Sequence, residues 1–231
     1  MRVLVIGGGI IGCATAYELA KAGCEVALFE RATPGAEASS AAAGLLAPLG
    51  ESTETTFARL ALASWRLYPD VVRELQARTG IDVEYVTRGT IYPMSATQTR
   101  GDAEAWALIP EFGVEVLEGK DVQALEPALS PKVRRAIFVK GDHWLNNQRL
   151  VLAYAQAAAG AGVELRTGEN VSRVIVEGGR ARAVVTEGER VEGDAVLLAA
   201  GAWTSELVAS FGMRLRVEPR RGQMIALAHV P

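Results

Sequence analysis

Three glycines and one acidic residue near the N-terminus have the types and spacing that a dinucleotide site needs. Gly7, Gly9 and Gly12 form a G-x-G-x-x-G motif, and Glu30 follows it along the chain. Gly7 allows a tight turn, Gly9 has no side chain to block a pyrophosphate, and Gly12 allows a helix to pack closely on a strand. Glu30 can accept hydrogen bonds from ribose hydroxyl groups, which favours a ribose without a 2′-phosphate. These four residues predict a dinucleotide site.

Two strands and a helix must hold these residues in position. Residues 3–6 are an apolar run rich in β-branched side chains, which is typical of a strand buried on both faces. Small and apolar residues recur at helical spacing over residues 10–21, so the helix begins within the glycines and offers its N–H groups to phosphates. Residues 26–29 predict a second strand that ends at Glu30. This context makes the glycine motif far more specific than the glycines alone.

Composition excludes several classes of protein. The chain has 231 residues, a net charge of −3 and 49% hydrophobic residues, which indicates a sizeable core and no nucleic-acid surface. The apolar N-terminus is broken by glycines and continues into charged residues, so it is not a signal peptide. No apolar run reaches the roughly 18 residues that a membrane-spanning helix needs. We expect a protein of the cytoplasm with no membrane partner.

The cysteines and histidines are too few for a metal cluster. The only cysteines are Cys13 and Cys24, which we expect to be small buried hydrophobic residues. The only histidines are His143 and His229. His143 follows Asp142, which invites a catalytic interpretation, but no nucleophile accompanies the pair. We therefore interpret His143 as structural or as lining a cavity, and we predict no metal site.

An alanine-rich tract follows the second strand. Residues 38–48 end their run of alanines at Gly44, which leaves the backbone bare where a large planar cofactor could pass. A helix without any ligand explains the same residue types, so both interpretations stay open. Ser39 or Ser40 can cap a short helix here.

Two longer segments have the spacing of helices. Apolar residues recur near a 3.6-residue period over residues 53–80, which predicts a long amphipathic helix with a break or kink at Pro69. Residues 97–112 predict a second helix, capped by Thr97 or Thr99.

The region between residues 81 and 144 differs from its flanks because it is rich in short strands. Residues 83–86 and 90–93 predict a hairpin that turns at Arg88 and Gly89. Residues 114–117 and 136–139 predict two further strands. We interpret this region as a second domain inserted into the nucleotide domain.

The last third of the chain returns to the nucleotide domain. Asn146 is expected to cap a helix, and residues 171–176 and 180–186 predict a hairpin. Residues 194–201 predict a buried parallel strand that ends at a small-residue turn, as at a cofactor site. Residues 217–227 predict a final strand.

Several motifs together carry a family resemblance. The chain resembles the flavin-dependent D-amino-acid oxidase superfamily and, within it, the glycine oxidases of thiamine biosynthesis. The motifs are VIGGGIIGCATAYELA at 5–20, ALFER at 27–31, SSAAAGLLAP at 39–48, LLAAGAWT at 197–204 and, more weakly, PRRGQM at 219–224.

The resemblance implies the cofactor, the fold and the domains. The cofactor is FAD, and the fold is α/β, with an FAD-binding Rossmann-like domain and an inserted α+β substrate domain that has a mixed or antiparallel sheet. The expected domain ranges are 1–80 with 145–213 for FAD, and 81–144 with 214–231 for the first part of the substrate domain.

The resemblance also implies which residues contact FAD. In chain order these are Gly7, Gly9, Ile10, Ile11 and Gly12 at the pyrophosphate turn, Glu30 and Arg31 at the ribose, Ala38 and Ser39 at the diphosphate, Ala43, Gly44 and Leu45 along the flavin, Val171 with its backbone at the adenine, and Gly201 with Trp203 near the cofactor.

The implied activity is oxidation of glycine or a related small amino acid to an imino acid, with O₂ as the electron acceptor and H₂O₂ as a product. Two alternatives stay open: an FAD-dependent dehydrogenase or oxidase of D-amino acids or sarcosine, and an inactive FAD-binding fragment that needs a complementary C-terminal polypeptide. Members of the family are longer, so we expect a C-terminal truncation that removes the arginine anchoring the substrate carboxylate. Arg220 and Arg221 do not match that arginine, and we assign no catalytic residue. A homo-oligomer is the other partner expected.

Overall fold

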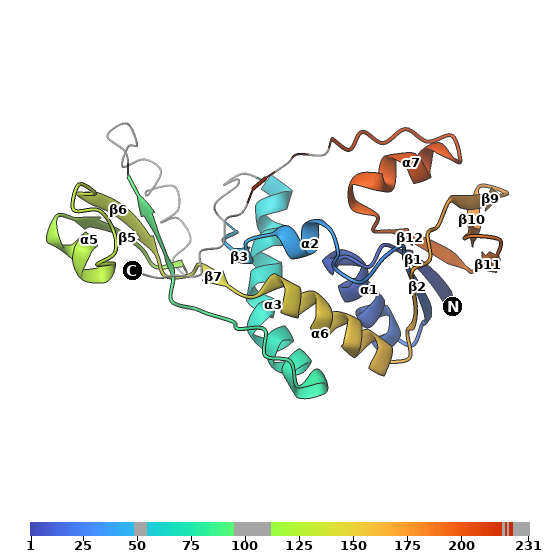
Figure 1. The fold of residues 1–231 in the computed structure, drawn as a ribbon, viewed down its shortest axis with the longest axis horizontal. Coiled ribbons are helices and arrows are strands. Elements are labelled where there is room, and N and C mark those ends of the chain that lie inside the picture. Colours follow the sequence, from blue (N-terminus) through green and yellow to red (C-terminus); the bar gives the residue numbers. More distant parts are fainter. Residues whose placement is uncertain (49–54, 95–111, 219, 221, 224–231) are drawn as a thin grey trace. The chain divides into compact units, whose positions relative to one another are not determined.

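The structure is a computed structural model that describes residues 1–48, 55–94, 112–218, 220 and 222–223 (Figure 1). The chain divides into two compact units. The first unit comprises Met1–Ala43, Arg73–Val83 and Asn146–Met224, and the second comprises Gly44–Val72, Glu84–Leu145 and Ile225–Pro231. The functional roles that we expect for two domains stay a prediction.

A parallel sheet of four strands is the centre of the first unit. Its inner strand β1 is buried along residues 3–6, as its unbroken run of apolar residues predicts. The strand order is β12 (Ala195–Leu198), β1 (Arg2–Ile6), β2 (Glu25–Glu30) and β8 (Glu164–Thr167). β1 therefore pairs in parallel with one strand from each end of the chain. The predicted parallel strands are confirmed.

Helices α1 (Ile10–Lys21) and α6 (Asn147–Gly160) pack against each other, and α1 also contacts β1 and β2 (Figure 1). α6 begins where Asn146 caps it, since the Asn146 side chain accepts a hydrogen bond from the Arg149 N–H group. This cap is the one that the sequence predicts.

An antiparallel sheet of three strands contributes to the core of the first unit. β9 (Arg173–Glu177) and β10 (Arg180–Val185) form the predicted hairpin, and β11 (Arg190–Glu192) continues it. Side chains from this sheet share a hydrophobic core with one face of the parallel sheet and with helix α7 (Thr204–Ala209). That core is formed by Leu4, Ile6, Ala27, Phe29, Val171, Val174, Val184, Val191 and Leu207.

The second unit contains two small antiparallel sheets. In the first, β6 (Arg135–Val139) lies between β4 (Thr90–Pro93) and β5 (Val114–Glu118). In the second, β3 (Leu45–Leu46) pairs with β7 (His143–Trp144). The other α-helices within the described residues are α2 (Ala38–Ala41), α3 (Thr55–Thr79) and α5 (Lys120–Leu125), and α3 contributes residues to both units. Among the described residues, no helix combines the length and hydropathy needed to span a lipid bilayer.

The predicted hairpin of residues 83–86 and 90–93 is wrong. β4 pairs instead with β6, while Val86 forms an isolated bridge with Trp144. β6 carries buried apolar residues and lies far along the chain, so the pairing that buries most apolar surface is not the local one. Gly89 turns the chain toward β6, since a Cβ atom there would lie 2.7 Å from the Phe138 ring.

Other expectations need correction. α3 continues through Pro69 as one helix, so the expected break is absent, while a kink at Pro69 stays a prediction. Neither Ser39 nor Ser40 caps α2, whose N-cap residue is Glu37. The described residues between 217 and 223 form no strand. The predicted helix at 97–112 lies outside the described residues, apart from Phe112.

The Asn146 cap provides a test of the fold. Replacing Asn146 with Ala removes the acceptor for the Arg149 N–H group, so we expect the free energy of unfolding to fall by about 1 kcal/mol. Urea denaturation followed by circular dichroism measures this change. Asn146→Asp keeps the acceptor oxygen and should retain most of the stability. Equal stability of the Ala variant and the parent protein would show that the cap does not stabilise α6.

Candidate cofactor site

A cavity of about 900 Å³ lies in the first unit at the carboxyl ends of its parallel strands. Its walls come from the turns after β1, β2 and β12 and from the segments that precede α2 and β9. In sheets of this kind, ligands bind at the carboxyl ends of the strands, where the chain leaves toward opposite sides of the sheet. The volume lies in the range of small-molecule and cofactor sites.

Close packing requires glycine at two positions of the turn after β1. Gly7 has φ +108°, and a Cβ atom there would lie 2.4 Å from the Ala199 carbonyl oxygen. A Cβ atom on Gly12 would lie 1.8 Å from the Gly7 carbonyl oxygen, so α1 can approach the turn only if residue 12 is glycine. Both contacts are with backbone atoms. A side chain at position 7 would displace the turn after β12, and a side chain at position 12 would displace α1.

Gly9 differs because it faces the cavity. A Cβ atom there would contact only the Ser39 hydroxyl oxygen, at 3.1 Å. The adjacent Ile10 N–H group, in the first turn of α1, donates a hydrogen bond to the same Ser39 oxygen at 3.0 Å. The first turn of α1 contains no acidic residue. Its partial positive charge is therefore available to an anion in the cavity.

The Glu30 carboxylate is held by the backbone on both sides. One oxygen accepts a hydrogen bond from the Gly8 N–H group at 2.7 Å, and the other accepts from the Ala32 N–H group at 2.8 Å. A Cβ atom on Gly8 would lie 2.8 Å from the Glu30 Cβ atom, so a side chain at position 8 would crowd Glu30. Each carboxylate oxygen can accept a further hydrogen bond, so Glu30 is a fixed acceptor in the cavity wall.

Arg31 joins two segments of the cavity wall. Its guanidinium carbon lies 3.7 Å from the centre of the Trp203 ring, and its Nη2 atom lies 2.6 Å from Glu37 Oε1. The stacking attracts the cation to the face of the indole ring. The end of β2, the start of α2 and the turn after β12 are therefore connected through one side chain.

Comparison with known proteins identifies the chain's family. Residues 2–231 match the family described as FAD dependent oxidoreductase. The chain belongs to that family.

Similar proteins of this family carry the name glycine oxidase. The glycine oxidase of Pseudomonas aeruginosa is 37% identical over 227 residues, and the match covers 97% of this chain and 62% of that protein. The glycine oxidase of Geobacillus kaustophilus is 36% identical over 237 residues, with 99% and 62% covered. The crystal structure of the Geobacillus kaustophilus enzyme superimposes with a TM-score of 0.84 at 35% identity, covering 93% of this chain and 59% of that one. The chain thus spans about three fifths of these relatives, and the predicted family and fold class are confirmed.

FAD is the cofactor of this family, and the residues of the cavity suit its ADP half. The open face of Gly9 and the N-terminus of α1 suit a diphosphate, and the fixed Glu30 carboxylate suits a ribose.

The structure brings most of the predicted cofactor residues together. Those that line the cavity are Gly7, Gly9, Ile10, Ile11, Glu30, Arg31, Ala38, Ser39, Val171, Gly201 and Trp203. Gly12 lies behind the turn, packed against Gly7. Ala43 belongs to the first unit but does not line the cavity, and Gly44 and Leu45 belong to the second unit.

Sequence reasoning missed several residues of the wall. Gly8 was visible as the middle glycine of the run, but only the fold shows that it accommodates Glu30. Gly8 itself does not line the cavity, whereas Gly35, Glu169 and Asn170 do. The last two lie in a loop between β8 and β9 whose residue types carry no motif.

Two tyrosines of the second unit contact the adjacent residues Asp142 and His143. The Tyr85 hydroxyl group lies 2.6 Å from His143 Nδ1, and the His143 ring lies 5.2 Å from the Trp65 ring. Burial lowers the pKa of His143. Tyr92 donates a hydrogen bond to Asp142 at 2.5 Å, and burial raises the pKa of Asp142. These contacts favour the structural interpretation of His143.

Cys13 is buried in α1, and its thiol donates to the Gly8 carbonyl oxygen at 3.3 Å. Burial raises the pKa of this thiol to about 12, so at neutral pH it packs as a neutral group. Among the described residues, no group of three or more histidine, cysteine, aspartate or glutamate side chains could hold a metal ion.

Gly9 tests the position of the diphosphate. Gly9→Val places a branched side chain in the cavity while making few contacts within the protein, so we expect a folded protein that purifies without FAD. Visible absorbance and circular dichroism measure the two properties. Gly160→Val, at a helix end with open space around it, is the matched control and should keep its flavin. Full flavin content in the Gly9→Val protein would contradict the assignment.

Glu30 tests the position of the ribose. Glu30→Ala removes the acceptor, and we expect FAD affinity to fall by the equivalent of about 1–3 kcal/mol, which is about fivefold to roughly 150-fold. Titration followed by flavin fluorescence measures the dissociation constant. An affinity within twofold of the parent protein would show that Glu30 does not hold the ribose.

Proposed function

We propose that this chain is the FAD-binding part of an oxidase that converts glycine or a related small amino acid to an imino acid with production of H₂O₂, in the biosynthesis of thiamine. The observation that carries the proposal is the Glu30 carboxylate, fixed by two backbone N–H groups beside the glycine turn in the wall of the cavity. The names of the relatives support glycine as the substrate. The motifs that carry the resemblance to the glycine oxidases of thiamine biosynthesis support the pathway.

In this proposal the chain's own residues bind and orient the cofactor. The turn of Gly7, Gly9 and Gly12 and the N-terminus of α1 hold the diphosphate, and Ala38 and Ser39 lie along its side. Glu30 and Arg31 lie at the ribose and Val171 at the adenine, while Gly201 and Trp203 close the wall after β12. Their shared cavity supports this assignment for all of them except Gly12, which supports the turn from behind.

The flavin end is assigned by resemblance alone. We propose that Ala43, Gly44 and Leu45 run along the flavin, where Gly44 with φ +77° keeps the backbone free of a side chain. A bound FAD would supply the redox chemistry, which is hydride acceptance from the α-carbon of the substrate and reoxidation by O₂. The protein supplies orientation and shields the cavity from water.

We propose the domain roles along with this function. Residues 1–80 and 145–213 bind FAD, and residues 81–144 and 214–231 form the first part of the substrate domain. The chain matches about three fifths of the length of these relatives. We propose that the group anchoring the substrate carboxylate lies in the part of the relatives that the chain does not match. A charged anchor of this kind contributes strongly to orienting the Cα–H bond.

The proposal predicts that residues 1–231, saturated with FAD, form no peroxide from glycine, sarcosine or D-alanine. A chimera that joins residues 1–231 to the C-terminal part of the Pseudomonas aeruginosa glycine oxidase should oxidise glycine at roughly 1 per second, an ordinary enzyme rate. A coupled peroxidase assay measures both. The same chimera with Gly9→Val is the control and should be inactive.

The outcomes separate the alternatives. Turnover by residues 1–231 alone would place the anchor within this chain and contradict the division. A chimera that binds FAD and turns over only with a quinone acceptor would instead indicate a dehydrogenase. Bound FAD without turnover of any of the three amino acids would overturn the substrate class.

A further inference from the structure

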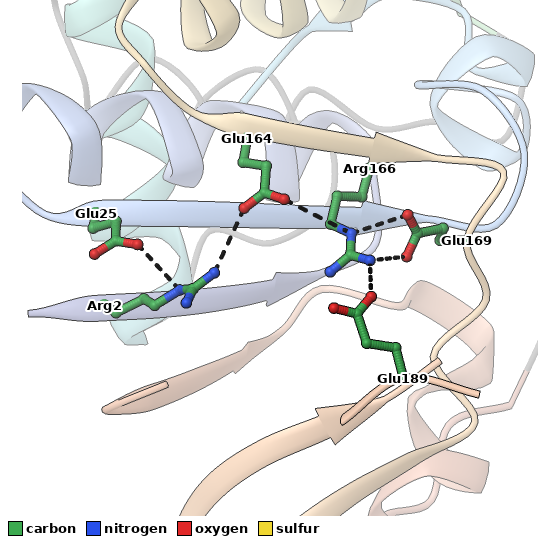
Figure 2. A network of polar contacts seen from close by, with 6 residues as sticks. All are labelled: Arg2, Glu25, Glu164, Arg166, Glu169 and Glu189. Carbon is green, nitrogen blue, oxygen red and sulfur yellow. Dashed lines mark hydrogen bonds and ion pairs between the residues drawn. The ribbon is translucent and has the colours of Figure 1, made fainter. Parts of the chain in front are cut away.

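Arg166 on β8 lies at the centre of a network of charges in the first unit (Figure 2). Its Nε and Nη2 atoms each lie 2.9 Å from one oxygen of Glu169, so the two side chains form a two-point contact. Nη2 also pairs with Glu189, and Nε lies 3.9 Å from Glu164 Oε1. The Arg166 side chain is 16% exposed, which makes it the least exposed cation of this network.

The same side chain packs on the cavity wall. The guanidinium carbon of Arg166 lies 5.0 Å from the centre of the Phe29 ring, and Phe29 is its direct partner in the β2–β8 ladder. Phe29 and Glu169 both line the cavity. Arg166 therefore contacts two members of the wall without lining the cavity itself.

Glu169 begins the wall segment, which we define as residues 169–172. All four residues line the cavity. Backbone hydrogen bonds hold both ends of the wall segment: the Glu169 N–H group donates to the Glu30 carbonyl oxygen at 3.0 Å, and the Ser172 N–H group donates to the Val185 carbonyl oxygen at 2.9 Å. At the first of these ends, the two-point contact with Arg166 also holds the Glu169 side chain.

Electrostatics explains why a cation is needed here. Glu169 and Glu189 share the Nη2 atom of Arg166 in spite of their like charges. The hydrogen bonds that Arg166 donates to Glu189 and Glu169 raise the pKa of Arg166, which keeps this cation charged. Without the guanidinium group, the two carboxylates would repel each other, and Glu169 would be free to turn toward the cavity.

We propose that Arg166 is a positioning residue for the adenine end of the FAD site: it holds Glu169, and through it the wall segment, in the position that FAD requires. This inference rests on the proposed function, because the adenine is assigned to Val171 within the wall segment. An exposed ion pair contributes little to stability, but a two-point contact with low exposure fixes geometry.

A double-mutant cycle tests this role. We expect Arg166→Gln to weaken FAD binding about tenfold in the parent protein and at most twofold in a Glu169→Gln background, because its effect passes through Glu169. In a Glu189→Gln background the loss should remain about tenfold. Flavin fluorescence titration gives the dissociation constants, and thermal melting of the FAD-free proteins reports stability separately.

Arg190→Gln is the matched control. Arg190 pairs with Glu177 and Glu192 in the neighbouring sheet and does not line the cavity, so its loss should change FAD affinity less than twofold. If Arg166→Gln does not fold, Arg166→Lys is measured in the same backgrounds. Lysine keeps the charge but loses the planar two-point contact, and we expect a loss of at least threefold that also disappears with Glu169→Gln.

Two results would overturn the inference while leaving the proposed function intact. One is FAD affinity in the Arg166 variant within twofold of the parent protein. The other is an equal loss in the parent and Glu169→Gln backgrounds, which would mean a general effect on the fold. A parent protein that does not bind FAD would instead contradict the proposed function.

Discussion

The contact between Gly12 and the Gly7 carbonyl oxygen is the constraint on which the site depends. A Cβ atom on Gly12 would come within 1.8 Å of that oxygen, a distance that no packing change around a rigid turn can relieve. The absence of a side chain brings the first turn of α1 next to the end of β1. The partial positive charge of the helix then lies at the carboxyl edge of the sheet, where the cavity forms.

Backbone N–H groups and two arginine side chains pair with three carboxylates of the cavity wall. Glu30 accepts from two backbone N–H groups, while Glu37 pairs with Arg31 and Glu169 pairs with Arg166. Each of these three carboxylates is thus held by a donor before any ligand enters. Such preorganisation matters for a cofactor that itself carries a diphosphate, because a free carboxylate in the wall would repel it.

The sequence predicts the parts of this fold that depend on neighbours along the chain. The strand, glycine turn and helix of residues 2–21, the Asn146 cap and the hairpin at residues 178–179 follow from local backbone preferences and hydrophobic periodicity. The pairing of β4 with β6 does not, because the partner is chosen by burial across many intervening residues. Ser39 and Ser40 are predicted as caps of α2 because they lie close to it in the sequence. The Ser39 hydroxyl oxygen instead accepts a hydrogen bond from the Ile10 N–H group at the start of α1, a contact that only the folded chain creates.

The site shows the same division between local and distant effects. The glycine motif and Glu30 are readable because each residue type has a direct chemical role. Gly8 and Arg166 are not, because their roles are to accommodate Glu30 and to hold Glu169, and these contacts exist only once the sheet has formed.

The central claim is that this chain holds the ADP half of FAD in the cavity of its first unit. Isothermal titration calorimetry of residues 1–231 with ADP and with FMN tests it most directly, because each ligand carries one half of the cofactor. We predict that ADP binds and competes with FAD, while FMN binds far more weakly and does not compete. Binding of FMN with equal or greater affinity, or failure of ADP to compete with FAD, would contradict the account.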